Sequence, residues 1–155
     1  MSLESVRQFF AERAPDIGII ELAESTATVA QAARAHHVKP GQIAKTLSLK
    51  VKDRVILIVT SGDLRLDNRK LKAMLGAKAR MLSTDEVVSW TGHPVGGVCP
   101  FGLETPLQVF CDISLQQYDE VLPAAGSIFS AVRISPALLA ELTDATWVDV
   151  CQPPA

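Results

Sequence analysis

The segment Lys45-Thr-Leu-Ser-Leu-Lys-Val-Lys-Asp-Arg-Val-Ile-Leu-Ile-Val-Thr60 determines the type of fold. Two runs rich in apolar and β-branched residues, Lys45–Val51 and Arg54–Thr60, are separated by only two residues, Lys52-Asp53, which predicts a β-hairpin. Residues 55–59 are apolar at every position. A strand of that kind makes apolar contacts on both faces, so we expect it to lie in the centre of a sheet.

Helix and strand signals alternate on both sides of this hairpin. Capping boxes at Thr28–Gln31 and Ser83–Glu86 each predict the start of a helix, and so do Asp67 and the pair Ser135-Pro136. Shorter strands are predicted at Ile17–Leu22, Ala79–Leu82, Leu107–Asp112, Ser127–Ile134 and Thr146–Val150. We therefore expect one α/β (α+β) domain over residues 1–155, with a mixed, largely antiparallel sheet or closed barrel wrapped by helices.

The composition is that of an ordinary globular protein, with 48% hydrophobic and 21% charged residues among 155. No apolar run is long enough to span a membrane, and the first residues contain no apolar signal core, which predicts a cytoplasmic protein. The three cysteines and three histidines have no metal-ligand spacing, so we expect no metal site.

The charge is distributed unevenly, although the net charge is only −2. Residues 39–80 contain eleven Lys or Arg against three Asp, a net +8, and the remaining residues carry −10. A basic face of this kind suits a polyanionic partner. The alternative is that these cations form ordinary solvated strand and helix surface.

The segment from Thr91 to Gly102 contains four of the nine glycines and two of the nine prolines. It cannot be regular helix or strand, because glycine relaxes the backbone and proline removes a donor. It also contains valine and phenylalanine, so it is not a solvated linker. Two interpretations remain open, a loop that lines a small-molecule pocket and a loop that only caps the core.

Lys45 is the best single candidate for a site residue. In a regular strand it shares one face with Ile43, Leu47, Leu49 and Val51, so its ammonium group points to the apolar side. A buried ammonium needs a partner and can have a lowered pKa. Lys45 therefore either faces an anionic ligand or, at the end of the strand, extends its ammonium outward to solvent.

Other familiar catalytic arrangements are weak or missing. Cys99 and His93 are close in sequence, but a reactive thiol needs an activating base, and an inert buried cysteine is far commoner. The chain contains neither a glycine-rich phosphate motif nor a G-x-S-x-G elbow. Ser127 and Ser130 flank a predicted turn at Gly126, where their hydroxyl groups serve either a pocket or the turn itself.

Several segments together resemble the YbaK/ProX family of aminoacyl-tRNA deacylases, free-standing relatives of the editing domain of bacterial prolyl-tRNA synthetases. They occur in the family's order and cover nearly the whole chain. The matching segments are Thr28–Ala33, Gln42–Leu47, Gly62–Asp67, Gly92 with Gly96–Gly102, and Ala125–Ser127.

The resemblance implies a mixed sheet curled into a barrel, surrounded by helices, and an enzyme that hydrolyses the ester of a mischarged tRNA. It implies no cofactor, no metal and no membrane; the expected partners are the acceptor end of aminoacyl-tRNA and prolyl-tRNA synthetase. The family's lysine corresponds to Lys45, and its G-x-x-x-P loop corresponds to residues 96–100. The catalytic candidates are Lys45, Gly96 and Gly97, and the substrate-binding candidates are Thr46, Val98, Cys99, Pro100, Phe101, Gly102, Gly126, Ser127 and Ser130.

The resemblance leaves the amino acid open among Ala, Cys, Ser and Thr, on tRNA(Pro) or a related tRNA. The alanine-clearing branch usually has Asn directly after the lysine, whereas this chain has Thr46 there. The alternative function is a non-catalytic module that binds tRNA or a synthetase through the basic residues 39–80.

Overall fold

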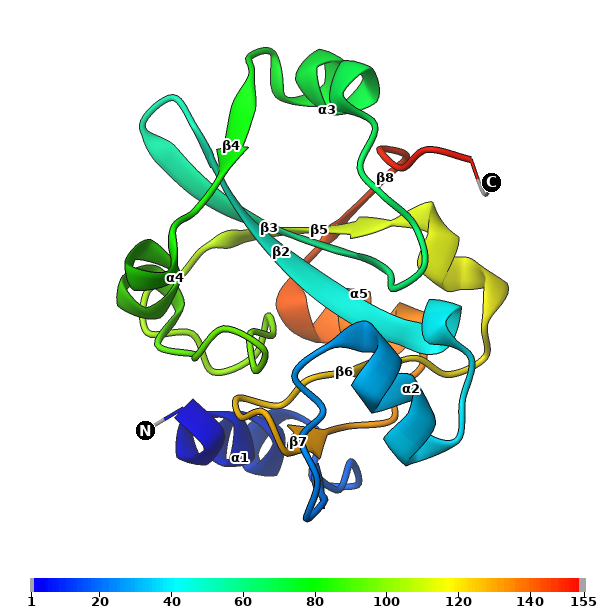
Figure 1. Cartoon of the computed structure of the whole chain (residues 1–155). Coiled ribbons are helices and arrows are strands. Elements are labelled where there is room, and N and C mark those ends of the chain that lie inside the picture. Colours follow the sequence, from blue (N-terminus) through cyan, green and yellow to red (C-terminus); the bar gives the residue numbers. More distant parts are fainter. Residues whose placement is uncertain (1, 154–155) are drawn as a thin grey trace.

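The β-hairpin predicted from the sequence runs through the middle of the protein (Figure 1), of which a computed structural model describes residues 2–153. Strand β2 (Ile43–Val51) pairs antiparallel with β3 (Arg54–Ser61) from Ala44 opposite Ser61 to Val51 opposite Arg54. Lys52 occupies the two-residue turn with φ 52°. The prediction of a hairpin with a central second strand is confirmed.

The remaining elements surround this hairpin. The other strands are β1 (Ile20–Glu21), β4 (Ala79–Met81), β5 (Gln108–Asp112), β6 (Leu122–Pro123), β7 (Ser130–Ala131) and β8 (Thr146–Val148). The α-helices are α1 (Ser2–Arg13), α2 (Val29–His36), α3 (Asn68–Leu75), α4 (Thr84–Thr91) and α5 (Pro136–Thr143). Two 3₁₀ helices, η1 (Pro40–Gln42) and η2 (Ile113–Gln117), precede β2 and follow β5.

The main sheet has the strand order β4-β2-β3-β5-β8, with β6 also paired to β2. The pairs β3–β5, β5–β8 and β2–β6 are parallel, so the antiparallel share is smaller than we expected. A mixed α+β fold is confirmed, but the barrel was wrong. Within residues 2–153 the sheet stays open, because no pairing joins β8 back to β4 or β6.

The two faces of β3 are buried against different helices. Leu57 and Val59 belong to a core cluster that includes residues of α1 and α5, whereas Ile56 and Ile58 pack in a second cluster with Leu71 of α3. All of residues 55–60 are almost fully buried. Residues 55–59 are apolar at every position because successive side chains enter different cores.

The helix starts follow the predicted caps. Thr28 and Ser83 each form a complete capping box, Asp67 accepts from two amides of α3, and Ser135 precedes Pro136 at the start of α5. Such caps satisfy amides that have no partner inside the helix. No helix within residues 2–153 is both long and apolar enough to cross a bilayer.

Two strands are much shorter than predicted, and one was missed. Of Ile17–Leu22 only Ile20–Glu21 forms a strand, and of Ser127–Ile134 only Ser130–Ala131 does. These two strands pair with each other as β1 and β7, and Ala131 and Ile134 also form isolated bridges with Ala124 and Val121. Strand β6 was missed because its two residues include Pro123, which cannot donate to a sheet.

Candidate functional site

A cavity of about 350 Å³ opens beside β2, between that strand, α2 and the loop after α4. Three segments far apart in sequence form much of its wall, and Figure 1 shows α2 lying close to the start of β2. The lining residues discussed below are Thr26, Ala27, His36, Lys45, Thr46, Leu47, Ser48, Met81, Leu82, Val95, Gly96, Val98 and Ser130.

The cavity lies along a free stretch of the edge of β2. Strand β6 pairs with the beginning of that edge, at Ile43 and Ala44, and β4 pairs with its end, from Leu49 onward. The Ser48 carbonyl accepts from the Leu82 amide 3.1 Å away, so the backbone groups of residue 48 point toward this edge. Because a strand's backbone groups alternate between its two edges, the N–H and C=O of Thr46 also point to the free edge and the cavity.

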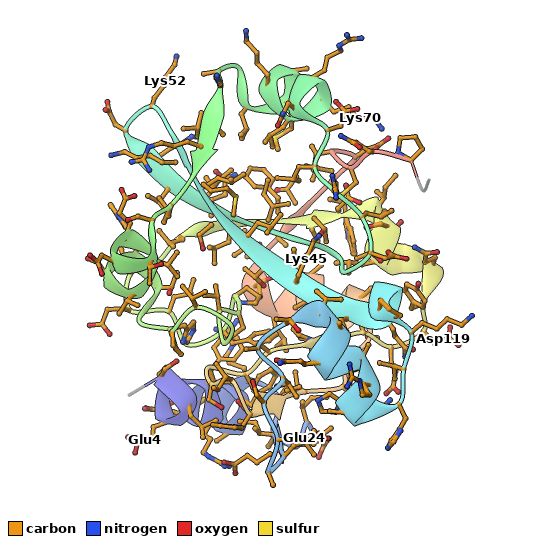
Figure 2. All side chains as sticks on the ribbon, viewed as in Figure 1. Glu4, Glu24, Lys45, Lys52, Lys70 and Asp119 are labelled. Carbon is orange, nitrogen blue, oxygen red and sulfur yellow. The ribbon has the colours of Figure 1, made fainter. Side chains whose placement is uncertain are left out.

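Lys45, the third residue of β2, is one of the residues that line this cavity; Figure 2 labels it on that strand. Its ammonium group donates to the Leu64 carbonyl. Burial lowers the pKa of Lys45, while the nearby Cys151 and Asp63 act in the opposite direction. Since an ammonium group has three donors and this contact uses one, Lys45 keeps hydrogen-bonding capacity for an anionic ligand.

The loop after α4 meets the cavity at Gly96, which has φ 89°. A Cβ atom on Gly96 would lie 2.9 Å from the Cβ of Ala27, so a side chain has no room there. Gly97 is buried and faces the Ser127 backbone, outside the cavity lining. Its N–H donates to the Pro94 carbonyl over 2.9 Å, and its carbonyl accepts from the Gly126 amide over 3.1 Å.

The wall opposite β2 is held together by hydrogen bonds between distant segments. Thr26 donates through both its amide and its hydroxyl group to the Ile128 carbonyl, over 2.6 and 2.9 Å. Ser130 is buried, and its hydroxyl oxygen lies 2.7 Å from that of Ser127. These contacts fix the segment before α2 against residues 127–130, so the cavity wall is preorganised.

Two polar atoms at the cavity are buried without a hydrogen-bond partner among the described residues. They are Thr46 Oγ1 and His36 Nε2. Burial, and secondly the charge of Arg133, lower the pKa of His36, which disfavours its protonated form. Buried polar groups are nearly always hydrogen-bonded, which marks both atoms as candidates for contact with a ligand.

The structure brings five of the predicted site residues together: Lys45, Thr46, Gly96, Val98 and Ser130 all line the cavity. The others lie outside its lining. Cys99 and Phe101 are fully buried in the main core, and Gly102 and Gly126 pack closely against Ser5 and Ser2 of α1. Of the remaining predicted residues, Gly97 and Pro100 are buried and Ser127 is partly buried; none of the three lines the cavity.

Sequence reasoning missed the contributions of α2 and of the segment around β4. The capping box at Thr28 located the start of α2, but only the fold shows that His36 faces the cavity. Met81 and Leu82 reach the cavity because β4 ends where the free edge of β2 begins. The sequence shows a histidine in an alanine-rich helix, but this pattern does not tell which segment the histidine contacts.

Cys99 is not a nucleophile in this structure. Burial raises the pKa of its thiol to about 12, and its sulfur lies 3.6 Å from His93 Nε2. That nitrogen is already within 2.7 Å of the Phe101 carbonyl, to which it donates. Within residues 2–153 no three His, Cys, Asp or Glu side chains gather where they could hold a metal ion.

His93 instead connects α1 to the loop, and this connection predicts a dependence of stability on pH. It is fully buried and also hydrogen-bonds Ser2 through Nδ1. Burial lowers the pKa of His93 below its usual 6.5. The unfolded chain therefore takes up a proton more readily, and the unfolding free energy should fall as the pH drops below 6.5.

Urea unfolding between neutral pH and about pH 5 measures this effect. The variant His93→Gln keeps a hydrogen-bonding side chain but does not titrate, so its stability should depend less on pH than that of the wild type. His36 and the carboxylates contribute equally to both proteins. Parallel pH profiles for the two proteins would show that His93 is not the titrating group.

Comparison with known proteins gives a consistent result. A family model described as the aminoacyl-tRNA editing domain matches residues 23–142. The uncharacterized protein YwhH of Bacillus subtilis (strain 168) is 46% identical over 154 residues, which cover 98% of each chain. A crystal structure described as a candidate trans-editing enzyme for prolyl tRNA synthetase is 33% identical, with a TM-score of 0.92 over 98% of each chain.

Part of the chain is also similar to much longer proteins. The proline–tRNA ligase of Nitratidesulfovibrio vulgaris (strain DP4) is 38% identical over 80 residues. These residues make up 51% of this chain and 14% of the ligase. The similarity therefore concerns one segment of the ligase.

Proposed function

The chain belongs to the aminoacyl-tRNA editing domain family, and on this basis we propose that it is a deacylase that hydrolyses the ester bond of a mischarged aminoacyl-tRNA. The observation that carries the proposal is that Lys45 and Gly96 line one preorganised cavity. A volume of about 350 Å³ suits a small aminoacyl group with part of its ribose. The proposed substrates carry Ala, Cys, Ser or Thr on tRNA(Pro) or a related tRNA.

Lys45 would act as a fixed positive charge. Its ammonium group donates to the Leu64 carbonyl, and its partial burial strengthens its attraction for an anion. It would bind the phosphate of the terminal adenosine or polarise the ester. An ammonium group that already donates to a backbone carbonyl is suited to this electrostatic role and not to nucleophilic attack.

The free edge of β2 supports a second element of the mechanism. Hydrolysis of an ester passes through a tetrahedral intermediate with a negatively charged oxygen, which backbone N–H groups stabilise well. The Gly97 amide already donates to Pro94. The Thr46 amide points to the free edge, so we assign it, together with the backbone at Gly96, to binding the substrate carbonyl. The adjacent ribose hydroxyl group of the substrate would assist in activating water.

A panel of tRNAs charged with Ala, Cys, Ser and Thr tests the proposed function. The purified protein should release at least one of these amino acids much faster than the spontaneous reaction does. The alternative function, a module that binds tRNA or a synthetase without catalysis, predicts binding with no hydrolysis of any member of the panel. Prolyl-tRNA synthetase should be added in a parallel series, since a partner is part of the proposal.

Thr46 gives a sharper prediction because its hydroxyl group is buried without a partner among the described residues. Thr46→Val keeps the shape and removes the hydroxyl group. If Thr46 Oγ1 binds substrate, kcat/KM should fall roughly threefold to tenfold, the value of one hydrogen bond. The free energy of unfolding should stay equal or rise, because an unsatisfied polar group is removed.

Steady-state kinetics and urea unfolding of the two proteins measure both effects. Thr84→Val is a control in which another threonine at the rim of the cavity is changed. Unchanged kinetics for Thr46→Val would exclude the hydroxyl group from substrate binding.

A further inference from the structure

The basic stretch at residues 39–80 does not form one face of the protein. It covers two strands whose side chains alternate between faces, and it also covers α3. Figure 2 shows Lys52 at the tip of the hairpin, Lys45 farther down β2 and Lys70 at a separate corner. Lys70 is also paired with Asp149 at 3.0 Å. The cations must therefore be considered in smaller groups.

One such group surrounds a second hollow, of about 310 Å³, beside the turn between β2 and β3. Four of its five lining residues are cationic, and the fifth is Ala79 of β4; we call this site the basic hollow. The four cations are Lys50, Lys52, Lys78 and Arg80.

Three of these cations have no ion pair within the part of the chain that the structure describes. Arg80 is paired with Glu86 at 2.9 Å, but Lys50, Lys52 and Lys78 have no carboxylate of residues 2–153 within salt-bridge distance. Lys50 also lies directly opposite Arg80 in the β2–β4 register. Like charges in that position destabilise a sheet, so a bound anion would relieve a repulsion that is built into the fold.

The basic hollow and the candidate active site are lined by neighbouring residues of the segment around β4. Ala79 and Arg80 line the hollow, whereas the next residues of the chain, Met81 and Leu82, line the cavity that contains Lys45. Lys50 is five residues from Lys45, a distance of about 17 Å along a strand, and this odd spacing places the two side chains on opposite faces of β2. Met81 follows Arg80 on β4, lines the cavity and is 53% exposed, so this part of β4 is open to a partner that reaches both sites.

We propose that Lys50, Lys52 and Lys78 form a phosphate-binding surface for the tRNA backbone, next to the single-stranded 3′ end that enters the cavity. This inference rests on the proposed function and adds the direction in which the tRNA leaves the site. Phosphate contacts position a nucleic acid and supply affinity that depends on salt, without reading sequence. The surface should therefore contribute to binding of the substrate and not to the chemical step.

The test compares two triple variants that lose the same charge. Lys50→Gln/Lys52→Asn/Lys78→Gln removes the surface, and asparagine is chosen at position 52 because it tolerates the positive φ of the turn. Lys39→Gln/Arg69→Gln/Lys72→Gln is the control, because these exposed cations line neither cavity. Each protein is assayed on full-length aminoacyl-tRNA and on 3′-aminoacyl-adenosine, which is too short to reach the basic hollow. Thermal melting verifies that each variant is folded.

For the first variant we expect kcat/KM on full-length tRNA to fall about 10-fold to 100-fold at low salt, with kcat preserved. The dependence of log kcat/KM on log salt should become shallower by about three, one unit for each lysine. Hydrolysis of aminoacyl-adenosine, and every measurement on the control variant, should match the wild type. Equal losses in both variants, equal losses on both substrates, or no loss at all would overturn the proposal.

Binding of uncharged tRNA separates this proposal from the proposed function. If the wild type hydrolyses neither substrate, the deacylase function fails. The phosphate-binding surface would still be supported if the first variant alone loses affinity for uncharged tRNA, and overturned if both variants bind like the wild type.

Discussion

Lys45→Ala is expected to lower the rate of aminoacyl-tRNA hydrolysis about 10²-fold to 10³-fold, which is the usual effect of removing one preorganised electrostatic contact. Lys45 lines the cavity in which we propose that the ester lies. Within the described residues its direct hydrogen bond is to a single carbonyl, that of Leu64. The loss should therefore affect activity far more than folding, and the melting temperature should change little.

Single-turnover kinetics and thermal melting of the same preparation measure both parts of this prediction. Lys72→Ala, which removes an exposed lysine from α3, is the matched control and should retain full activity. Lys45→Arg should not restore the activity, because a planar guanidinium group does not replace an ammonium group in a confined site. Near-normal turnover of Lys45→Ala would refute the role of Lys45.

Gly97→Ala is expected to destabilise the protein by about 1–3 kcal/mol and to lower kcat/KM at the same time. A Cβ atom at this position would lie 2.8 Å from the backbone nitrogen and carbonyl carbon of Ser127. These are main-chain atoms, so they cannot move aside as a flexible side chain can. Relief of the clash would push the loop away from residues 126–130, which separates Gly96 from Ser130 across the cavity.

Urea unfolding and steady-state kinetics measure the two effects of Gly97→Ala. Gly18→Ala provides the control, since a Cβ atom there has no neighbour within 4 Å and the backbone φ is not positive. That substitution should be neutral or stabilise the protein by up to about 1 kcal/mol, by restricting the unfolded chain. If Gly97→Ala matched the control in stability and activity, the close approach of the two segments would not matter for the site.

The parts of the fold that local sequence specifies were predictable. The hairpin follows from two apolar runs with a two-residue gap, and the helix starts follow from Thr28, Asp67, Ser83 and Ser135. Sheet closure is different, because it depends on which distant strands pair. The parallel pairs β3–β5 and β5–β8 join segments about fifty and thirty-five residues apart, and no local pattern encodes them.

The site was predictable to a similar degree. Strand parity identified Lys45, and the clustered glycines and prolines identified the loop that contains Gly96. Periodicity gives no direction for side chains inside such a loop, so Cys99 and Phe101 could not be recognised as core residues. The side of α2 that His36 occupies is set only when the helix packs beside β2. Ala33 of α2 and Ile43 of β2 belong to the same core cluster there.

The cavity wall has a consequence for how the protein acquires its site during synthesis. The lining begins at Thr26 and ends at Ala131, and the two ends are joined through the hydrogen bonds between Thr26 and Ile128. A nascent chain can form the hairpin early, since its contacts are local, but it cannot enclose the cavity until Ala131 has left the ribosome. Truncated products that stop before that residue would keep the lysine and lack the enclosure around it.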